Sequence, residues 1–360
     1  MTHFFVDPNI AKAKTIDTAF YTEEKYFELS KEKIFARSLQ YIGHSDMLKE
    51  KNTAYPFTLL ENYLNEPLLL TRDANDEIHC LSNVCTHRGN LLVYEPCKIR
   101  DIVCKYHGRR FSCEGKFLSM PQFKEVENFP SGSDNLHKLT LFNWGKLLFT
   151  SLYQNISARD FLSEIRDRMR WFPMDKLEYR ADLSKDYIVN ANWALYCENY
   201  LEGFHIPFVH PGLNSVLDFS EYTTEIFKYS NLQIGIAKKG DDCFELPSSS
   251  PDYGKNIAGY YFWVFPNLML NFYPWGLSLN YIQPLEVSKT KVSFHVYVTD
   301  PGKLNTGAGG NLDSVEMEDE EVVENVQKGI RSRFYTHGRY SVTMEKGTHH
   351  FHSLIAKFIG

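Results

Sequence analysis

Two short motifs combine cysteine and histidine in the pattern of a metal site. The first is Cys85-x-His87, and the second, which follows after sixteen intervening residues, is Cys104-x-x-His107. Thiolate sulfur and imidazole nitrogen are ligands of both zinc and iron in proteins. We therefore expect these four side chains to meet at the tips of two neighbouring loops and to share one metal centre.

Two kinds of metal centre use this set of ligands. Zinc would bind all four side chains tetrahedrally, whereas a [2Fe–2S] cluster would take both cysteines on one iron and both histidines on the other. Gly89 and Gly108 follow the two motifs and would let backbone N–H groups approach the cluster sulfides. The flanking sequence also predicts β-hairpins and not the helix of a zinc finger. The cluster is therefore favoured, and a structural zinc site is the alternative.

A second group of possible ligands lies between residues 198 and 210. His205 and His210 are five residues apart, Glu202 precedes them, and Pro207 lies between them. Proline interrupts a helix, so His210 could turn to share a metal with His205. Two histidines and one carboxylate on one face of an octahedral metal form the facial triad of non-haem Fe(II) oxygenases, whose opposite face stays open for O₂ and water. We expect a mononuclear iron at this place.

The carboxylate of such a triad must come from another part of the chain. The acidic run at residues 316–321 is the best source, and Asp319 is the candidate within it. A competing explanation is that these acids form the solvated first turn of a helix, where the helix dipole favours negative charge.

The first part of the chain predicts a helix followed by a β region. Residues 21–39 are expected to be helical, with Thr22 as the N-cap and acids in the first turn. Between residues 40 and 151 short β-type runs alternate with turn signals, as in a small antiparallel barrel or sandwich. Both cysteine–histidine motifs lie within this β region.

The rest of the chain predicts a mixture of helices and strands, so the fold class is α+β. Helices are expected at residues 160–169, at 193–209, where Pro211-Gly212 would close the helix, and at 315–334. Strand-like runs are expected at residues 183–191, 222–236 and 259–298. We expect an N-terminal helical segment (1–39), a cluster domain (40–152) and a domain that binds the mononuclear iron (153–360).

Composition disfavours several classes of protein. The chain has 360 residues and a formal net charge of −6, which argues against a general nucleic-acid binder and a polybasic membrane-surface protein. The longest apolar stretch, residues 260–270, is interrupted by Pro266 and is shorter than the roughly 20 residues that span a bilayer. Seven cysteines, an odd number, favour reduced thiols and metal ligation. Since the N-terminus lacks the apolar core of a signal peptide, a cytoplasmic location is expected.

Residues 85–89 and 104–108 resemble the two Rieske motifs of ring-hydroxylating oxygenases. Lys105 stands where proline is common and Arg109 where tryptophan is common, but neither is a ligand position. The likeness extends over about residues 20–358 and looks closest to choline-monooxygenase-like members. It implies a small antiparallel β Rieske domain with a [2Fe–2S] cluster, and a helix-grip-type α+β catalytic domain with a large antiparallel sheet and a mononuclear Fe(II). The N-terminal segment would pack on the catalytic domain.

The resemblance also implies which acid binds the iron. In the family this ligand is an aspartate eight residues before a glutamine, which here is Asp319 before Gln327, with Glu318 as the fallback.

A further implied role is electron transfer between subunits. In the family an acid three residues before the first iron histidine, here Glu202, would connect the cluster ligand His107 of one subunit to His205 of its neighbour. This path requires a homotrimer. Asn199 is expected near the iron, although a hydrogen bond at a helix end would explain it equally well.

By this resemblance the chain is the terminal component of an oxygenase. It would take electrons from a separate NAD(P)H-dependent reductase, with or without a ferredoxin, since the chain lacks a GxGxxG dinucleotide fingerprint. It would use them with O₂ to hydroxylate, or oxidatively dealkylate, a small organic substrate.

The substrate class is left open between two chemistries. Aromatic residues within 260–275 could surround a quaternary ammonium or amine, or equally a flat hydrophobic molecule, and strand alternation should turn about half of them away from any pocket. The alternatives are therefore an aromatic ring-hydroxylating dioxygenase and, as a different class, a Rieske electron-transfer protein without oxygenase activity.

Overall fold

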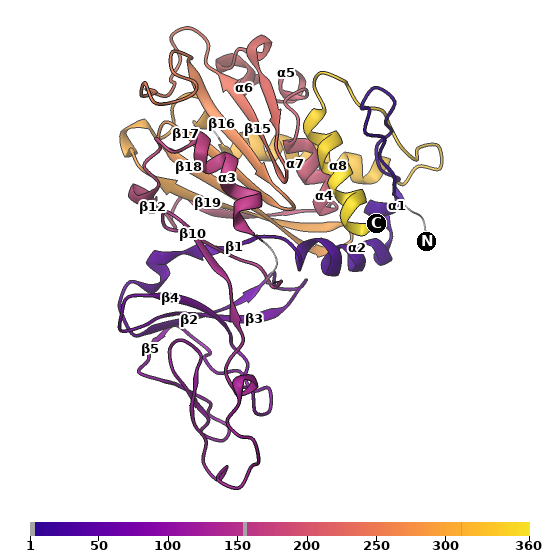
Figure 1. The fold of residues 1–360 in the computed structure, drawn as a ribbon. Helices are drawn as coiled ribbons and strands as arrows, with labels where there is room; N and C mark the ends of the chain where they lie inside the picture. The colour runs from indigo at the N-terminus through magenta and orange to yellow at the C-terminus, as the bar shows by residue number, and fades with distance from the viewer. Residues whose placement is uncertain (1–3, 154–156, 311) are drawn as a thin grey trace. The chain divides into compact units, whose positions relative to one another are not determined.

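The computed structural model describes residues 4–153, 157–310 and 312–360. The chain divides into two compact units. One is Leu39–Ile156, and the other is Met1–Ser38 together with Ser157–Gly360. Figure 1 labels many of their helices and strands. Among the described residues no helix is long and apolar enough to cross a membrane. Both units are built on antiparallel sheets, and the expected α+β fold class is confirmed.

The unit Leu39–Ile156 consists of short strands joined by turns. Its elements are β1 (Gln40–His44), η2 (Ser45–Leu48), β2 (Thr53–Leu59), β3 (Glu66–Arg72), β4 (Ile78–Ser82), β5 (Cys97–Lys98), β6 (Ile102–Val103), β7 (Arg110–Phe111), β8 (Phe117–Ser119), η3 (Gly132–Asp134), β9 (Lys138–Leu139), β10 (Leu141–Trp144) and β11 (Leu147–Thr150). The strands pair in the orders β5-β2-β3-β4-β9, β1-β11-β10 and β6-β7-β8. This is the small β domain that the sequence predicts around the cysteine–histidine motifs.

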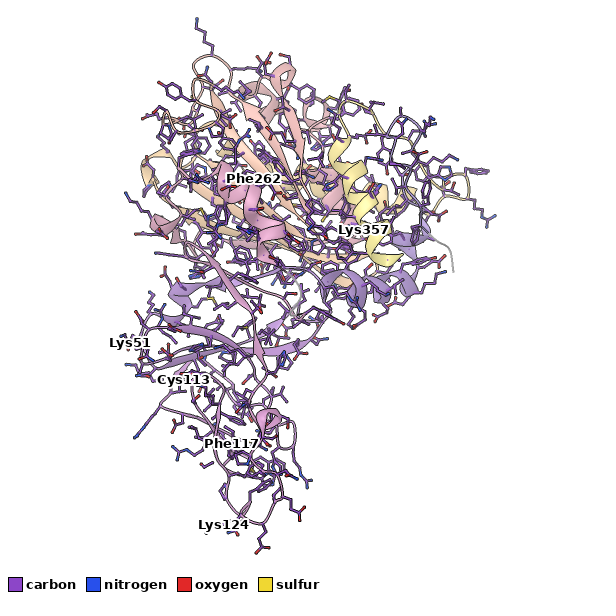
Figure 2. All side chains as sticks on the ribbon, in the orientation of Figure 1. Lys51, Cys113, Phe117, Lys124, Phe262 and Lys357 are labelled. Atoms are coloured by element: carbon purple, nitrogen blue, oxygen red, sulfur yellow. The ribbon has the colours of Figure 1, made fainter. Side chains whose placement is uncertain are left out.

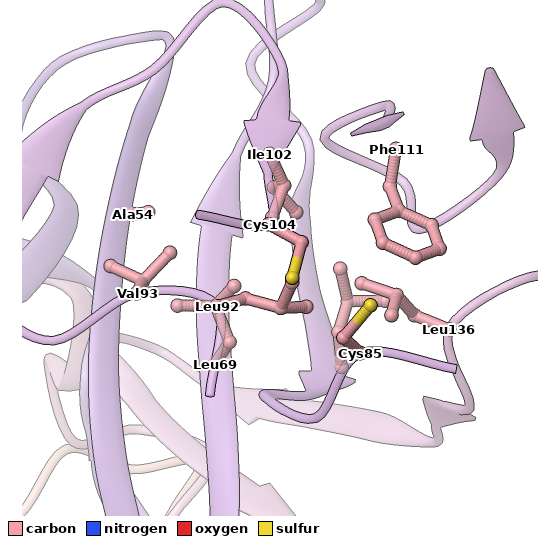
Figure 3. Close-up of a cluster of buried hydrophobic side chains, with 10 residues drawn as sticks. Ala54, Leu69, Cys85, Leu92, Val93, Ile102, Cys104, Phe111 and Leu136 are labelled. Carbon is pink, nitrogen blue, oxygen red and sulfur yellow. The ribbon is translucent and has the colours of Figure 1, made fainter. Parts of the chain in front are cut away.

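The apolar core of this unit reaches the cysteines of both motifs. In Figure 3 the sulfur atoms of Cys85 and Cys104 lie among the side chains of Leu92, Leu136 and Phe111. All five residues are at most 4% exposed. Burying such apolar side chains stabilises the fold by about 1.5–3 kcal/mol each, so the same packing that holds the unit together fixes the two thiols.

The other unit is organised around one long antiparallel sheet. Its strands are β12 (Glu178–Tyr179), β13 (Lys185–Val189), β14 (Thr223–Ile226), β15 (Ser230–Ile236), β16 (Ile257–Val264), β17 (Leu268–Tyr273), β18 (Gly276–Glu286) and β19 (Lys289–Val298). The order is β12-β19-β18-β17-β16-β15-β14, with β13 also paired to β19. The large antiparallel sheet expected for the catalytic domain is thus confirmed.

The helices of this unit pack on the sheet and on one another. They are α1 (Ala19–Thr22), α2 (Glu24–Ser30), the π-helical turn η1 (Lys31–Phe35), α3 (Ala158–Arg168), η4 (Met174–Lys176), α4 (Trp193–Tyr200), α5 (Ile206–Val209), α6 (Pro211–Val216), η5 (Phe219–Glu221), η6 (Pro301–Lys303), η7 (Gly307–Gly309), α7 (Leu312–Gly329) and α8 (Lys346–Ile359). The buried Trp193 contacts Phe20, Phe35 and Phe351 edge-on. The N-terminal segment and α8 therefore hold the start of α4.

Aromatic residues of the central strands alternate between the two faces of the sheet. Tyr261 and Tyr273 pack edge-on against each other on one face, with ring centroids 5.9 Å apart. Tyr260, Phe262 and Phe272 form contacts on the opposite face, and Figure 2 marks Phe262 on β16. About half of the candidate aromatic residues therefore face away from the side of the sheet that carries Tyr261 and Tyr273, as strand geometry requires.

The predicted helix at residues 21–39 is wrong in its start. Thr22 is the last residue of α1, and Glu23, with the extended dihedrals φ −104° and ψ 128°, precedes α2. The run of helix formers in this segment gives no local signal for the interruption, which occurs at the exposed Glu23.

The single helix predicted at residues 193–209 is also wrong. The chain leaves α4 after Tyr200 and re-enters helices at α5 and α6. Pro207 lies in the first turn of α5, and Pro211 opens α6 where it was expected to close a helix. Proline suits the first helical turn because it has no N–H to leave unpaired, so both prolines start helices.

A glycine at the start of α8 controls how closely this helix approaches the end of α4. A Cβ atom on Gly347 would lie 2.2 Å from the carbonyl oxygen of Leu201, the residue before Glu202. Real Cβ atoms do not approach a backbone oxygen so closely, so only glycine fits unless the backbone moves.

We predict that Gly347→Ala lowers the stability of the protein by about 1–3 kcal/mol through overpacking. The midpoint of thermal unfolding should fall by about 2–4 °C per kcal/mol. Gly329→Ala is the matched control, because nothing lies within 4 Å of a Cβ at that glycine, and it should leave the midpoint equal or raised. Equal midpoints for Gly347→Ala and the parent protein would contradict the packing argument.

Candidate metal centres

The two cysteine–histidine loops share one backbone conformation. Gly89 and Gly108, each four residues after the cysteine, donate a backbone hydrogen bond of 3.0 Å to the carbonyl of Cys85 and Cys104 respectively. Their φ values are +70° and +73°, in the left-handed region that glycine adopts without strain. The two loops are thus equivalent supports for one ligand pair each.

The cysteines and the histidines of these loops differ in their exposure to solvent. Cys85 and Cys104 are 3% and 2% exposed, and both are free thiols. His87 is half-buried and His107 is exposed, with their ring centroids 4.8 Å apart. Both sulfurs lie on the core side and both imidazoles toward the surface, which suits a cluster that takes cysteines on one iron and histidines on the other.

Hydrogen bonds to sulfur distinguish the two thiols. Burial raises the pKa of the Cys85 thiol. Burial acts in the same direction on Cys104, but hydrogen bonds from the backbone of Tyr106, from Cys85 and from the backbone of His107 outweigh it and lower the pKa of the Cys104 thiol. The amide of Asn90 adds a contact of 3.7 Å to Cys104 Sγ. These donors suit a thiolate that binds a metal.

Arg109, which replaces the tryptophan common at this position, is accommodated by an ion pair and aromatic rings. It is 2% exposed, and its guanidinium lies 2.6 Å from the Asp134 carboxylate. The guanidinium carbon is 5.8, 5.0 and 5.4 Å from the ring centroids of Phe111, Phe117 and Phe129. A buried charge is tolerated when it is paired in this way, so the departure leaves the ligand loops intact.

The second centre is formed by His205, His210 and Asp319, whose ligand atoms all lie within 4.8 Å of one another. The Nε2 atoms of the two histidines are 3.1 Å apart. Asp319 Oδ1 lies 3.0 Å from His210 Nε2 and 3.5 Å from His205 Nε2. Two imidazoles and one carboxylate therefore converge on a single point.

The outer nitrogen of each imidazole is held by its own carboxylate. His205 Nδ1 lies 2.8 Å from Glu202 Oε1, and His210 Nδ1 lies 2.7 Å from Glu318 Oε2. An ionised carboxylate only accepts hydrogen bonds, so each Nδ1 carries the proton and donates it. The neutral rings then turn two Nε2 lone pairs and one carboxylate toward each other, an arrangement that a cation stabilises.

A proton can take the place of a metal at this point. Burial opposes protonation of His210, but the hydrogen bonds and charges of Asp319 and Glu318 outweigh it and raise the pKa of the imidazole. The same donor set, two histidines and a carboxylate with further carboxylates behind them, fits a divalent iron.

Separate elements bring these ligands together. His205 directly precedes α5, His210 lies between α5 and α6, and Asp319 lies inside α7. Because α7 begins at Leu312, the acidic run is in the interior of the helix, and the expectation of a first-turn position is wrong. Asp319 faces both Nε2 atoms, whereas Glu318 contacts the far side of His210.

A cavity of about 100 Å³ adjoins the triad. The residues around it come from α4, α5, α6 and α7, from the segments that adjoin these helices, and from one face of the sheet; they are Tyr196, Asn199, Tyr200, Glu202, His205, Ile206, His210, Leu213, Tyr222, Gln233, Tyr261, Asn271, Tyr273, Ser278, Asn280, Phe294, Leu312, Val315, Glu316 and Asp319. Asn199, expected near the iron, is among them. A molecule bound in this cavity lies beside the three converging ligands.

Glu316 is a residue of this site that sequence reasoning missed. Its side chain is 3% exposed, and its Oε2 accepts a hydrogen bond of 2.5 Å from the Tyr196 hydroxyl. Burial raises the pKa of this carboxyl to about 8; the hydrogen bond from Tyr196 acts in the opposite direction, and the charges of Asp319 and Glu320 add to the rise. Its spacing from Asp319 could have identified it. Residues i and i+3 lie on the same face of a helix, so this spacing places Glu316 on the face that carries Asp319.

Comparisons with known proteins agree with this geometry. Residues 174–360 match the family "Ring hydroxylating alpha subunit (catalytic domain)", and residues 38–130 match "Rieske [2Fe-2S] domain". The chloroplastic choline monooxygenase of Arabidopsis thaliana is 30% identical over 372 residues, which cover 97% of this chain and 84% of that protein. The carnitine monooxygenase oxygenase subunit of Escherichia coli K12 is 27% identical, with 97% and 95% covered.

A solved structure shares the whole fold. A crystal structure of the quaternary ammonium Rieske monooxygenase CntA has a TM-score of 0.77 and 25% identity, with 98% of this chain and 97% of that chain covered. The resemblance seen in the motifs is therefore confirmed, and with it an iron–sulfur cluster and a mononuclear iron as the cofactors of the family. The chain belongs to the ring-hydroxylating oxygenase alpha subunits, the Rieske-type non-haem iron oxygenases.

Proposed function

We propose that this chain is the terminal oxygenase component of a monooxygenase that hydroxylates, or oxidatively dealkylates, a small quaternary ammonium or amine compound. The observation that carries the proposal is the joining of a two-histidine, one-carboxylate site to a cavity with tyrosine rings and a buried carboxylate. The named substrates of the relatives, choline and carnitine, are compounds of this class.

Each cofactor has a set of residues that would hold it. Cys85, His87, Cys104 and His107 would bind the [2Fe–2S] cluster, in a Rieske domain of residues 40–152. His205, His210 and Asp319 would bind iron in a catalytic domain of residues 153–360, on which residues 1–39 pack. When bound, the cluster supplies single electrons and the iron supplies the activation of O₂.

The side chains around the iron ligands have positioning tasks. Glu202 and Glu318 hold the two imidazoles in one tautomer and one orientation, as carboxylates behind metal-bound histidines do. The tyrosines of the cavity exclude water from the substrate and limit the orientations in which its carbon atoms approach the iron. Asn199, at the end of α4, offers an amide to a molecule in the same cavity.

Glu202 is also our candidate for the path between the two centres. It holds His205 twice, through Nδ1 at 2.8 Å and through the backbone N–H at 3.1 Å. Its side chain keeps 15% of its surface exposed, and the neighbouring Phe204 and Phe208 are 44% and 79% exposed. Such a surface suits contact with the exposed His107 of a second subunit, which would make the active assembly a homotrimer.

The reaction also needs partners that supply electrons and oxygen. An oxygenase of this family needs O₂, substrate and a reductase, and we propose that the reductase is a separate NAD(P)H-dependent protein, with or without a ferredoxin. A cytoplasmic location stays a proposal that rests on the cysteines, which are free in the structure.

The aromatic dioxygenase alternative is less well supported. A flat neutral hydrocarbon makes no use of the buried Glu316, and it would leave the unpartnered Oε1 of this carboxyl buried against an apolar ligand, which is costly. The electron-carrier alternative leaves the converging histidines and Asp319 without a purpose.

The first prediction concerns metal content and turnover. Protein loaded with iron and sulfide should contain about three irons for two sulfides and give a Rieske EPR signal on reduction. After removal of excess dithionite, addition of O₂ with choline or carnitine should give oxidised product in a single turnover, whereas toluene should give none. Iron equal to sulfide, with no substrate-dependent O₂ uptake, would indicate an electron carrier.

The second prediction concerns Glu318. The substitution Glu318→Gln should weaken iron binding at the second centre by about 10- to 100-fold, because the carboxylate no longer orients His210, while the cluster signal is unchanged. Titration of iron into the protein, with the bound and free metal measured at each step, gives the affinity of the second centre. Glu321→Gln, at an exposed acid of the same helix, is the control; equal affinities in the two variants would remove the orienting role.

The third prediction concerns Glu202. At saturating iron the substitution Glu202→Ala should leave both metal centres filled, although iron binds more weakly because His205 loses its orienting carboxylate; it should abolish turnover, because electrons no longer reach His205. Stopped-flow reoxidation of the reduced cluster in the presence of O₂ and choline reports the transfer directly. The exposed Glu221 serves as the control through Glu221→Ala. Normal reoxidation in Glu202→Ala would exclude the proposed path.

A further inference from the structure

One carboxylate in the wall of the cavity takes no part in holding the iron ligands. Glu316 is 3% exposed, and only its Oε2 has a partner, the hydroxyl of Tyr196 at 2.5 Å. Its Oε1 is buried and makes no hydrogen bond with any residue that the structure describes. A buried carboxylate oxygen without a partner costs free energy, so this oxygen is available to a bound molecule.

Glu316 faces the same cavity as the iron ligands, so it would contact the same bound molecule. It precedes Asp319 by three residues on α7, which places both side chains on one face of the helix. Both residues line the cavity, together with His205 and His210. A ligand of Glu316 therefore lies beside the iron ligands.

The remaining walls of the cavity suit a positive charge. Besides Tyr196, four tyrosines contribute rings, namely Tyr200, Tyr222, Tyr261 and Tyr273, and the faces of such rings attract cations. None of the described residues that line the cavity is a lysine or an arginine. The acids that line the cavity are Glu202, Glu316 and Asp319. Asp319 would bind iron and Glu202 contacts His205, so Glu316 is the acid whose charge is left for a ligand.

We propose that Glu316 is the counter-ion of the substrate's cationic nitrogen and thereby selects a charged substrate over a neutral one of the same shape. The inference rests on the proposed function and deepens it, because it assigns the cation preference to one side chain. The hydroxyl of Tyr196 fixes the carboxyl group through Oε2, and Oε1 faces the cationic nitrogen. The positive charge of the bound nitrogen favours the ionised form of Glu316, which burial alone disfavours. The ionic contact holds the nitrogen near α7, so that the carbon atoms attached to it lie toward His205 and His210.

The test compares two molecules that differ in charge alone. Choline and 3,3-dimethylbutan-1-ol have the same shape, with N⁺ replaced by carbon in the second. Their affinities are measured by calorimetry with the iron-loaded protein without oxygen or reductant, in the parent protein and in Glu316→Gln. The control is Glu321→Gln, which removes an exposed acid of the same helix that does not line the cavity. Iron content and cluster EPR show that each variant is folded and loaded.

We expect the parent protein to prefer choline, and Glu316→Gln to bind choline at least about 30-fold more weakly, as for other buried charge pairs. Binding of the neutral alcohol should change by less than about threefold, and Glu321→Gln should behave as the parent. Glu316→Asp, which keeps the charge, should retain most of the preference for choline; its loss in this variant would contradict the counter-ion role.

The failures of the two proposals are distinguishable. If the parent prefers choline and Glu316→Gln keeps the same preference, the role of Glu316 is overturned while the cationic substrate stands. If the parent binds choline no better than the alcohol, the cationic substrate class itself fails, and the role of Glu316 fails with it.

Discussion

Two imidazole nitrogens and a carboxylate oxygen face one another at 3.0–3.5 Å in this protein, and the rest of the catalytic unit depends on this arrangement. Glu202 and Glu318 hold the protonated Nδ1 atoms of His205 and His210. The Nε2 atoms that face Asp319 are therefore unprotonated. Such a cluster of donors is stable around a cation and strained without one. The fold must therefore hold the three ligands in place against their mutual repulsion.

Packing remote from the ligands supplies that restraint. Asn192 caps α4, and its backbone N–H donates to Gln327 of α7 at 2.7 Å, so the helix that carries Asp319 is tied to the helix that precedes His205. Gly347 lets α8 approach the backbone at Leu201. The sheet supports the same segment from below, since Gln233 donates to the carbonyl of Tyr200 at 2.6 Å.

The cluster ligands could be predicted from the sequence because their geometry is local. Cys85 and His87, or Cys104 and His107, sit on one loop each, and the glycine that completes each loop is visible in the sequence. The iron site was less accessible, because Asp319 lies 109 positions from His210 and periodicity cannot say which acid of a charged run turns inward. The sequence alone offered Asp319 as a candidate within this run, and the family resemblance then favoured it over Glu318.

Tertiary packing explains what the sequence alone missed. The break after Tyr200 has no strong local signal, since the prolines that seemed to mark it open the following helices. The acidic run looked like a solvated helix end, yet the helix begins earlier, at Leu312, and buries Glu316 against Tyr196. A buried acid among exposed ones is invisible until the partner helix is in place.

Anomalous diffraction at the iron absorption edge from crystals of the loaded protein tests the central claim most directly. We expect separate iron positions in each subunit: a pair bounded by Cys85, His87, Cys104 and His107, and a single ion bounded by His205, His210 and Asp319. Density at the first position alone, with the two histidines of the second turned apart in the loaded protein, would contradict it.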